Sequence, residues 1–103
     1  MKVSNLTSPR TGSKVANQFI MVDGRTTVFQ SYDSIIVKRV WHYADDNADG
    51  FSGYKITLDK NYWDYSVTTG KYRNQFLGEN KATTLKKIKS GEYQLADLNK
   101  ESE

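Results

Sequence analysis

The pattern of hydrophobic and polar positions changes near the middle of the chain, and its first half is typical of β-strands. Runs rich in β-branched and aromatic residues lie at Gln18–Val22 and Thr26–Gln30, and the Asp-Gly pair between them favours a two-residue hairpin turn. Ser34–His42 predicts a third strand, buried on both faces at its start. Tyr54–Asp59 alternates, which predicts a fourth strand whose second side, including Asp59, faces water.

The second half of the chain predicts helices. A helix through Lys71–Leu77 places Tyr72 and Phe76 on one face and ends at Gly78. A second helix runs from about Lys81 to Lys89. Strands followed by helices indicate an α+β fold, in which an antiparallel sheet of about four strands in the N-terminal half precedes two short helices packed on one face.

The length of 103 residues indicates one domain spanning residues 1–103. We expect residues 1–7 and 99–103 to be loosely ordered. Near the C-terminus, Tyr93, Leu95 and Leu98 alternate loosely, which indicates either a short last strand or a tail packed on the sheet.

Composition narrows the class of protein. The chain has no cysteine, which excludes disulfides and thiolate metal sites and favours a reducing, cytoplasmic location. No apolar run has the length of a signal peptide core or a membrane span, so we expect no membrane partner. Residues 60–91 carry seven basic and two acidic side chains. Such a block faces an acidic protein, a nucleic acid or simply solvent.

The sequence offers little for metal binding or catalysis. Asp45–Gly50 matches the first half of a calcium-binding EF-hand loop, but Ile56 stands where the bidentate Glu is needed, so a plain Asx-rich loop is favoured. His42 is the only histidine, and no nucleophile motif or Gly-rich phosphate loop accompanies it. We therefore expect no metal site, no cofactor and no enzymatic activity.

Binding is the function that the residues favour most. The segment YWDYSVTTGKYRNQFL (residues 62–77) interleaves five aromatic rings with Lys, Arg, Asn and Gln side chains. Both kinds of residue are enriched where proteins contact partners. The alternative is that several rings belong to the core, with Tyr72 and Phe76 anchoring the helix. The predicted partner-binding residues are Trp63, Tyr65, Lys71, Arg73, Asn74, Lys86, Lys87 and Lys89.

Five strings in the chain carry a resemblance to a known family: SPRTG (8–12), VANQF (15–19), FQSYDSII (29–36), LDKNYWDYS (58–66) and KYRNQFLG (71–78). With these strings the chain resembles a family of small proteins, mostly of unknown role, encoded by phages and prophages of Gram-positive (Firmicute) bacteria. The resemblance covers most of the chain. It implies a role in host takeover or counter-defence, including inhibition of a nuclease complex by an anti-CRISPR protein.

The resemblance leads to two hypotheses about the partner. The first is a host defence protein or nuclease complex, blocked by a small phage protein that occupies a protein or nucleic-acid surface. The second is nucleic acid, which this chain would bind as a phage accessory protein through its basic and aromatic side chains. A sponge for a small nucleotide signal is a third possibility, and the oligomeric state stays open.

Overall fold

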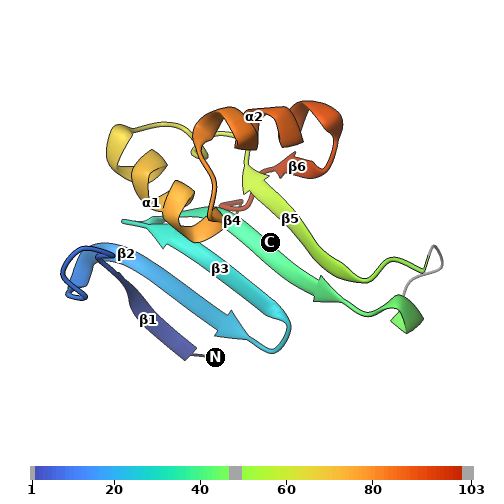
Figure 1. The fold of residues 1–103 in the computed structure, drawn as a ribbon, viewed down its shortest axis with the longest axis horizontal. Coiled ribbons are helices and arrows are strands. Elements are labelled where there is room, and N and C mark those ends of the chain that lie inside the picture. Colours follow the sequence, from blue (N-terminus) through green and yellow to red (C-terminus); the bar gives the residue numbers. More distant parts are fainter. Residues whose placement is uncertain (1, 47–49, 101–103) are drawn as a thin grey trace.

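The computed structural model describes residues 2–46 and 50–100 and contains one six-stranded sheet and two helices (Figure 1). The α+β class is confirmed, whereas the expected strand number of about four is too low. The strands are β1 (Lys2–Thr7), β2 (Lys14–Asp23), β3 (Thr26–Ser31), β4 (Ser34–His42), β5 (Gly53–Asp59) and β6 (Tyr93–Ala96). A short 3-10 helix, η1 (Ala44–Asp46), follows β4.

The order of the strands in the sheet follows their order in the chain. β1 to β5 form an antiparallel meander, and β6 pairs with β5 in parallel, so the sheet is mixed. A parallel neighbour requires a connection long enough to return the chain to the same end of the sheet. The segment between β5 and β6, which contains both helices, provides that connection (Figure 1).

The helices α1 (Val67–Leu77) and α2 (Lys81–Ser90) cover one face at one end of the sheet (Figure 1). α1 begins four residues earlier than the sequence predicted. Ser66 caps it, because the Ser66 hydroxyl accepts the Thr69 N–H at 3.1 Å. In the described part of the chain, no helix has the length and apolar character needed to cross a membrane.

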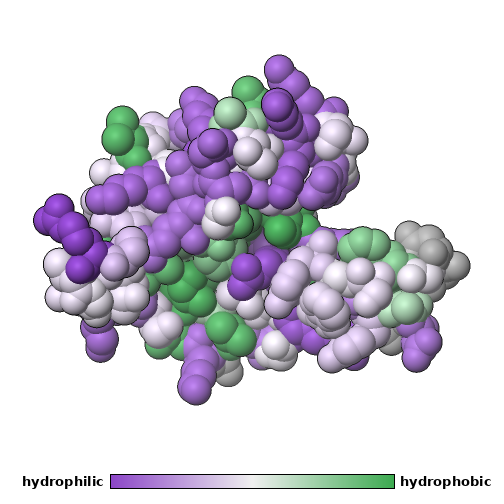
Figure 2. Space-filling model, in the orientation of Figure 1, coloured by the Kyte–Doolittle hydropathy of each residue, from purple (hydrophilic) through white to green (hydrophobic). Residues whose placement is uncertain are grey.

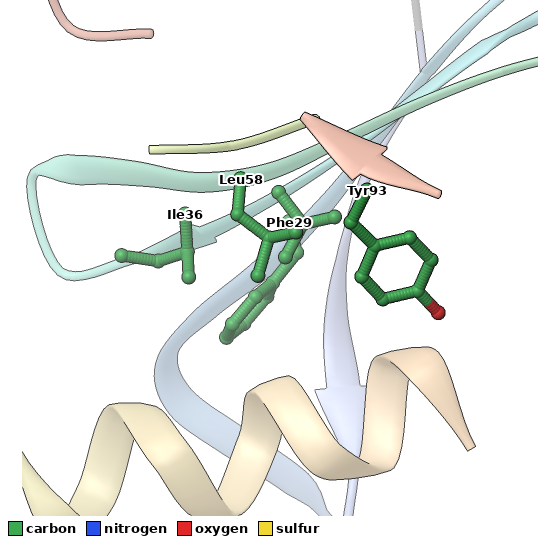
Figure 3. Close-up of a cluster of buried hydrophobic side chains, with 5 residues drawn as sticks. Phe29, Ile36, Leu58 and Tyr93 are labelled. Carbon is green, nitrogen blue, oxygen red and sulfur yellow. The ribbon is translucent and has the colours of Figure 1, made fainter. Parts of the chain in front are cut away.

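The core lies between the sheet and the helices. Figure 3 shows the side chains of Phe29, Leu58 and Tyr93 directed from the strands toward a helix. Phe76 of α1 stacks on Phe29 with ring centroids 5.7 Å apart, as the predicted anchoring role of Phe76 requires. A β-bulge lets the consecutive residues Ile36 and Val37 both be fully buried, which confirms the predicted burial at the start of β4.

Near both ends, the described part of the chain contacts neighbouring strands. Residues 2–7, expected to be loose, form the edge strand β1. Near the other end, the Asn99 side chain accepts the Ile35 N–H at 2.7 Å and donates to the Ile35 carbonyl at 2.9 Å, as a neighbouring strand would. Residues 101–103 lie outside the described residues.

Asp59 was predicted to face water, and that prediction is wrong. Its side chain is fully buried and accepts the Leu98 N–H at 2.7 Å, so the C-terminal segment covers it. A buried carboxylate is tolerated when backbone N–H groups satisfy its oxygens.

Candidate functional site

An open hollow of about 680 Å³ lies beside the first turn of α1 and the start of α2. We call it the α1 hollow. Four of the residues that line it were predicted from the sequence: Tyr65, Lys71, Arg73 and Asn74. The other five were not: Asp64, Ser66, Val67, Gly70 and Lys81. The structure therefore brings half of the predicted partner-binding residues to one place.

Arg73 lines the hollow but is only 1% exposed, so it offers almost no surface to a partner. One guanidinium nitrogen donates to the Trp63 carbonyl at 2.6 Å and to the Asp64 carboxylate at 3.2 Å. The other terminal nitrogen donates to the Asn74 side chain at 2.9 Å. The guanidinium also lies over the Trp63 ring, 5.2 Å from its centroid. These contacts join α1 to the segment before it, which is a structural role.

Asp64 completes this junction. Its carboxylate contacts Lys81 at 2.6 Å as well as Arg73, and its side chain is 30% exposed. Partial burial pushes the pKa of Asp64 upward, but the hydrogen bonds and charges of Lys81 and Arg73 outweigh that effect and leave the pKa below its ordinary value of 3.8. Asp64 therefore stays ionised at neutral pH and ties the start of α2 to the segment before α1.

The segment between β5 and α1 is also held at its beginning. The second carboxylate oxygen of Asp59 accepts the N–H groups of Asn61 and Tyr62 at 3.0 and 2.9 Å. The Tyr62 and Tyr65 rings pack edge to face with centroids 5.3 Å apart. Because Asp59 fixes one end of this segment and Arg73 the other, the segment presents its exposed side chains in a defined arrangement.

Two exposed apolar or aromatic side chains line the α1 hollow, one near the end of this rigid segment and one at the start of α1. Tyr65 is 47% exposed, and Val67, the first residue of α1, is 91% exposed. Lys71 and Lys81 flank them on the wall of the α1 hollow. An exposed apolar point surrounded by long cationic side chains is the composition of a contact site, with a central anchor and a polar rim.

Lys87, another predicted contact residue, belongs to a network between α2 and β6. Its amino group contacts Glu79 at 2.9 Å, and the same Glu79 oxygen accepts the Tyr93 hydroxyl at 2.8 Å. The second Glu79 oxygen accepts the hydroxyl of buried Thr84 at 2.6 Å. The side chain of Glu79 is only 9% exposed. This network fastens α2 to the sheet, and Lys87 is one of its members.

The network shifts the pKa values of its members. Burial raises the pKa of Glu79, but hydrogen bonds from Thr84, Lys87 and Tyr93 more than offset burial and bring it below the ordinary value of 4.5. The Glu79 partner raises the pKa of Lys87. Burial, with Glu79 as acceptor, raises the pKa of Tyr93 to about 12.

The remaining predicted residues divide between surface and core. Lys71, Lys86 and Lys89 are exposed, but only Lys71 lines the α1 hollow. Trp63 is partly buried and packs against the core cluster. Figure 2 shows mainly hydrophilic residues over the helices and a hydrophobic band beneath them. The exposed lysines belong to that hydrophilic layer.

Sequence reasoning missed Val67 and Lys81. The signal for Val67 was present, since a residue directly after an N-cap serine has little of the helix around it and tends to face solvent. Lys81 had no comparable signal, because only the packing of α2 beside the segment before α1 brings Lys81 to Asp64.

No group of three or more metal-ligating side chains occurs among the described residues. The loop considered for calcium, Asp45–Gly50, has residues 47–49 outside the described part of the chain.

Comparison with protein families places the chain by sequence. A family model described as a family of unknown function, DUF8033, matches residues 1–92. The chain belongs to this family. The match covers the whole α1 hollow and ends just before β6. Neither the curated proteins nor the solved structures contain a match.

Proposed function

We propose that this DUF8033 protein is a non-catalytic binding protein of the phage counter-defence kind, an anti-CRISPR-type inhibitor that occupies a surface of a host nuclease complex in the bacterial cytoplasm. The observation that carries the proposal is a pair of exposed side chains on the α1 hollow: Tyr65 in the rigid segment before α1, and Val67 at the start of α1. The resemblance to phage proteins of Gram-positive bacteria supplies the context.

The energetics of this surface suit an inhibitor. An exposed valine and tyrosine lose contact with water when a partner covers them, and apolar burial contributes about 25 cal/mol per Å². The segment loses little conformational freedom on binding, because Arg73 and Asp59 already hold it. Lys71 and Lys81 would steer the protein toward an acidic surface.

The test is capture of a partner followed by an activity measurement. Tagged protein is used to purify complexes from a Gram-positive host that carries a nuclease defence system, and nuclease activity is measured against added protein. We expect inhibition that saturates at a fixed ratio of protein to nuclease complex and does not deepen with incubation time. Inhibition by substoichiometric protein that grows with time would indicate catalysis instead, and an unaffected nuclease would remove the anti-CRISPR proposal.

A second candidate is a phage accessory protein that binds nucleic acid through the helices. It is favoured by three exposed lysines of the helices, Lys71, Lys86 and Lys89. The aromatic ring of Tyr65 lines the α1 hollow together with Lys71. Binding through these lysines would weaken steeply as salt rises, because each phosphate contact releases counterions. The absence of any complex with DNA or RNA at low salt would eliminate this candidate.

A further inference from the structure

Aromatic rings and guanidinium groups form a continuous row across the face of the sheet that carries the helices. The Trp41 ring packs edge to face against Tyr43 and Tyr54, with centroids 6.1 and 4.9 Å away. The Arg25 guanidinium lies 4.5 Å from the Tyr43 centroid. At the other end, the Arg39 guanidinium lies 4.8 Å from the centroid of Tyr54. We call this row the ring ladder, and its members are Arg25, Tyr43, Trp41, Tyr54 and Arg39.

The pairing of the strands builds the ladder. Arg39 and Trp41 are two residues apart on β4, so they face the same side of the sheet. Tyr54 is the cross-strand partner of Trp41 and falls on that side too. The inner end of the ladder meets α1, because the Arg39 guanidinium also lies 4.7 Å from the Phe76 centroid.

The outer part of the ladder is open to solvent. Tyr43 is 51% exposed and Tyr54 is 52% exposed. Figure 1 shows both helices at one end of the sheet, with the far ends of β4 and β5 reaching beyond them. Figure 2 shows pale colours, neither strongly hydrophilic nor strongly hydrophobic, over these far ends. The helices thus leave this section of the sheet without a cover.

Arg39 is the unusual member. Two rings hold its guanidinium group, yet that group forms no hydrogen bond or ion pair with any residue that the structure describes, and its buried Nε has no partner there. A guanidinium fixed in place without a carboxylate is prepared for an anion from outside, and its fork of N–H groups matches a phosphate or a carboxylate.

On the sheet, the residues paired across Arg39 include no acid, and Glu92, which shares a hollow with Tyr54, lies 3.8 Å from the Lys87 amino group. The row of paired residues that runs across the sheet through Arg39 contains a second base and no acid: Lys2, Val22, Thr27, Arg39, Ile56 and Tyr93. The acid Asp23 follows Val22 and so falls on the opposite face. Asp45 lies in η1, which follows β4 in the chain, and it is not one of the residues paired in the sheet.

We propose that the ring ladder binds single-stranded nucleic acid, with bases stacked on the exposed rings of Tyr43 and Tyr54 and a phosphate bound by Arg39. A protein carboxylate would satisfy Arg39 but leave the rings uncovered. A nucleotide strand satisfies both, because each unit brings a flat base and a phosphate. The ring ladder shares no residue with the α1 hollow, so substitutions can address each surface separately.

The test measures fluorescence anisotropy of a labelled oligo(dT) of about 15 nucleotides, a length that one small domain can engage. Tyr54→Ser and Arg39→Gln should each weaken binding roughly 5- to 100-fold, the range expected for losing one stacked base or its phosphate contact. Lys38→Gln is the charge-matched control, because it removes the neighbouring charge from the opposite face. Tyr32→Asn is the ring-matched control, since Tyr32 is 47% exposed and lies in a turn with a positive φ that Asn accepts.

Thermal melts of the same variants check folding, and Tyr43→Ser replaces Arg39→Gln if that variant unfolds. The proposal holds if both ladder variants lose affinity while both controls retain it. It is overturned if oligo(dT) does not bind at low salt, or if the controls lose as much affinity as the ladder variants. It is equally overturned if Lys86→Gln with Lys89→Gln abolishes binding while the ladder variants bind normally, or if poly-glutamate binds the ladder and oligo(dT) does not.

Discussion

At the scale of single residues, the structure separates charged side chains that hold the fold from those that offer a surface. Arg73 and Lys71 are two positions apart in one helix, yet Arg73 is 1% exposed and Lys71 is exposed. A buried guanidinium with three oxygen partners fixes the segment before α1. An exposed lysine contributes little to stability and is available to a partner.

Arg73→Ala tests this separation. Removing the guanidinium leaves the Trp63 carbonyl without its donor and opens a cavity beside Gly70, so the free energy of unfolding should fall by about 2–4 kcal/mol. Lys71→Ala should stay within about 0.5 kcal/mol of the wild type. Urea unfolding measures both. An Arg73→Ala variant as stable as the wild type would show that the contacts of Arg73 do not hold this segment.

The sequence identified this segment but not the roles within it. The sequence shows that residues 62–77 are rich in aromatic and basic side chains. It does not show which of these side chains are exposed, because that depends on how the chain folds back over them. Arg73 and Lys71 have the same charge and similar flexibility, so nothing in the string of residues distinguishes a buried cation from a solvated one. The partners of Arg73 make the difference: Trp63 and Asp64 lie ten and nine residues earlier in the chain and become its neighbours only when the segment before α1 folds back on the helix.

At the scale of elements, Glu79 fastens α2 to β6. Its carboxylate accepts hydrogen bonds from Thr84, Lys87 and Tyr93 and is nearly buried. The sequence predicted α2 closely, but it left β6 as one of two alternatives, and it missed β1 altogether. β1 is an edge strand of mostly polar residues, in which the hydrophobic alternation is weak. Pairing with β2, not local propensity, makes it a strand.

Because the pKa of Glu79 is lowered in the folded state, the stability that Glu79 gives to the contact between α2 and β6 depends on pH. The pKa is below 4.5 in the folded state, so the stabilisation from Glu79 is complete above pH 4.5 and disappears as pH falls through the folded-state value. Glu79→Gln should cost about 1–3 kcal/mol at pH 7 and flatten the loss of stability on acidification. Chemical denaturation across the acid range measures both effects.

Glu92→Gln is the matched control for this experiment. Glu92 is 3.8 Å from the same Lys87, but its side chain is 61% exposed, so the substitution should change stability by about 0.5 kcal/mol or less. If Glu79→Gln and Glu92→Gln behaved alike at neutral pH and in acid, the buried network would not be the attachment that we describe.

At the scale of the whole molecule, the fold presents two separate surfaces. The helices provide the α1 hollow, and the uncovered far ends of β4 and β5 provide the ring ladder (Figure 1). The hollow was largely predictable because its residues lie in one stretch of sequence. The ladder was not, because its rings and cations come from the β2–β3 turn, β4 and β5 and meet only through strand pairing.

The central claim is that the exposed residues beside the α1 hollow contact a partner without supporting the fold. Val67→Glu tests it most directly. The first turn of α1 contains no acidic residue, so a glutamate there should interact favourably with the helix dipole and keep or slightly raise the melting temperature. The same charge should prevent an apolar contact. Val3→Glu, at a 59% exposed valine on the edge strand β1, is the control.

The decisive measurement is the affinity of each variant for the nuclease complex that we propose as the partner, made beside its melting curve. The account predicts that Val67→Glu folds normally and loses at least about tenfold in affinity, as expected for a central contact residue, while Val3→Glu binds like the wild type. A Val67→Glu protein that folds and binds the complex with unchanged affinity would contradict it.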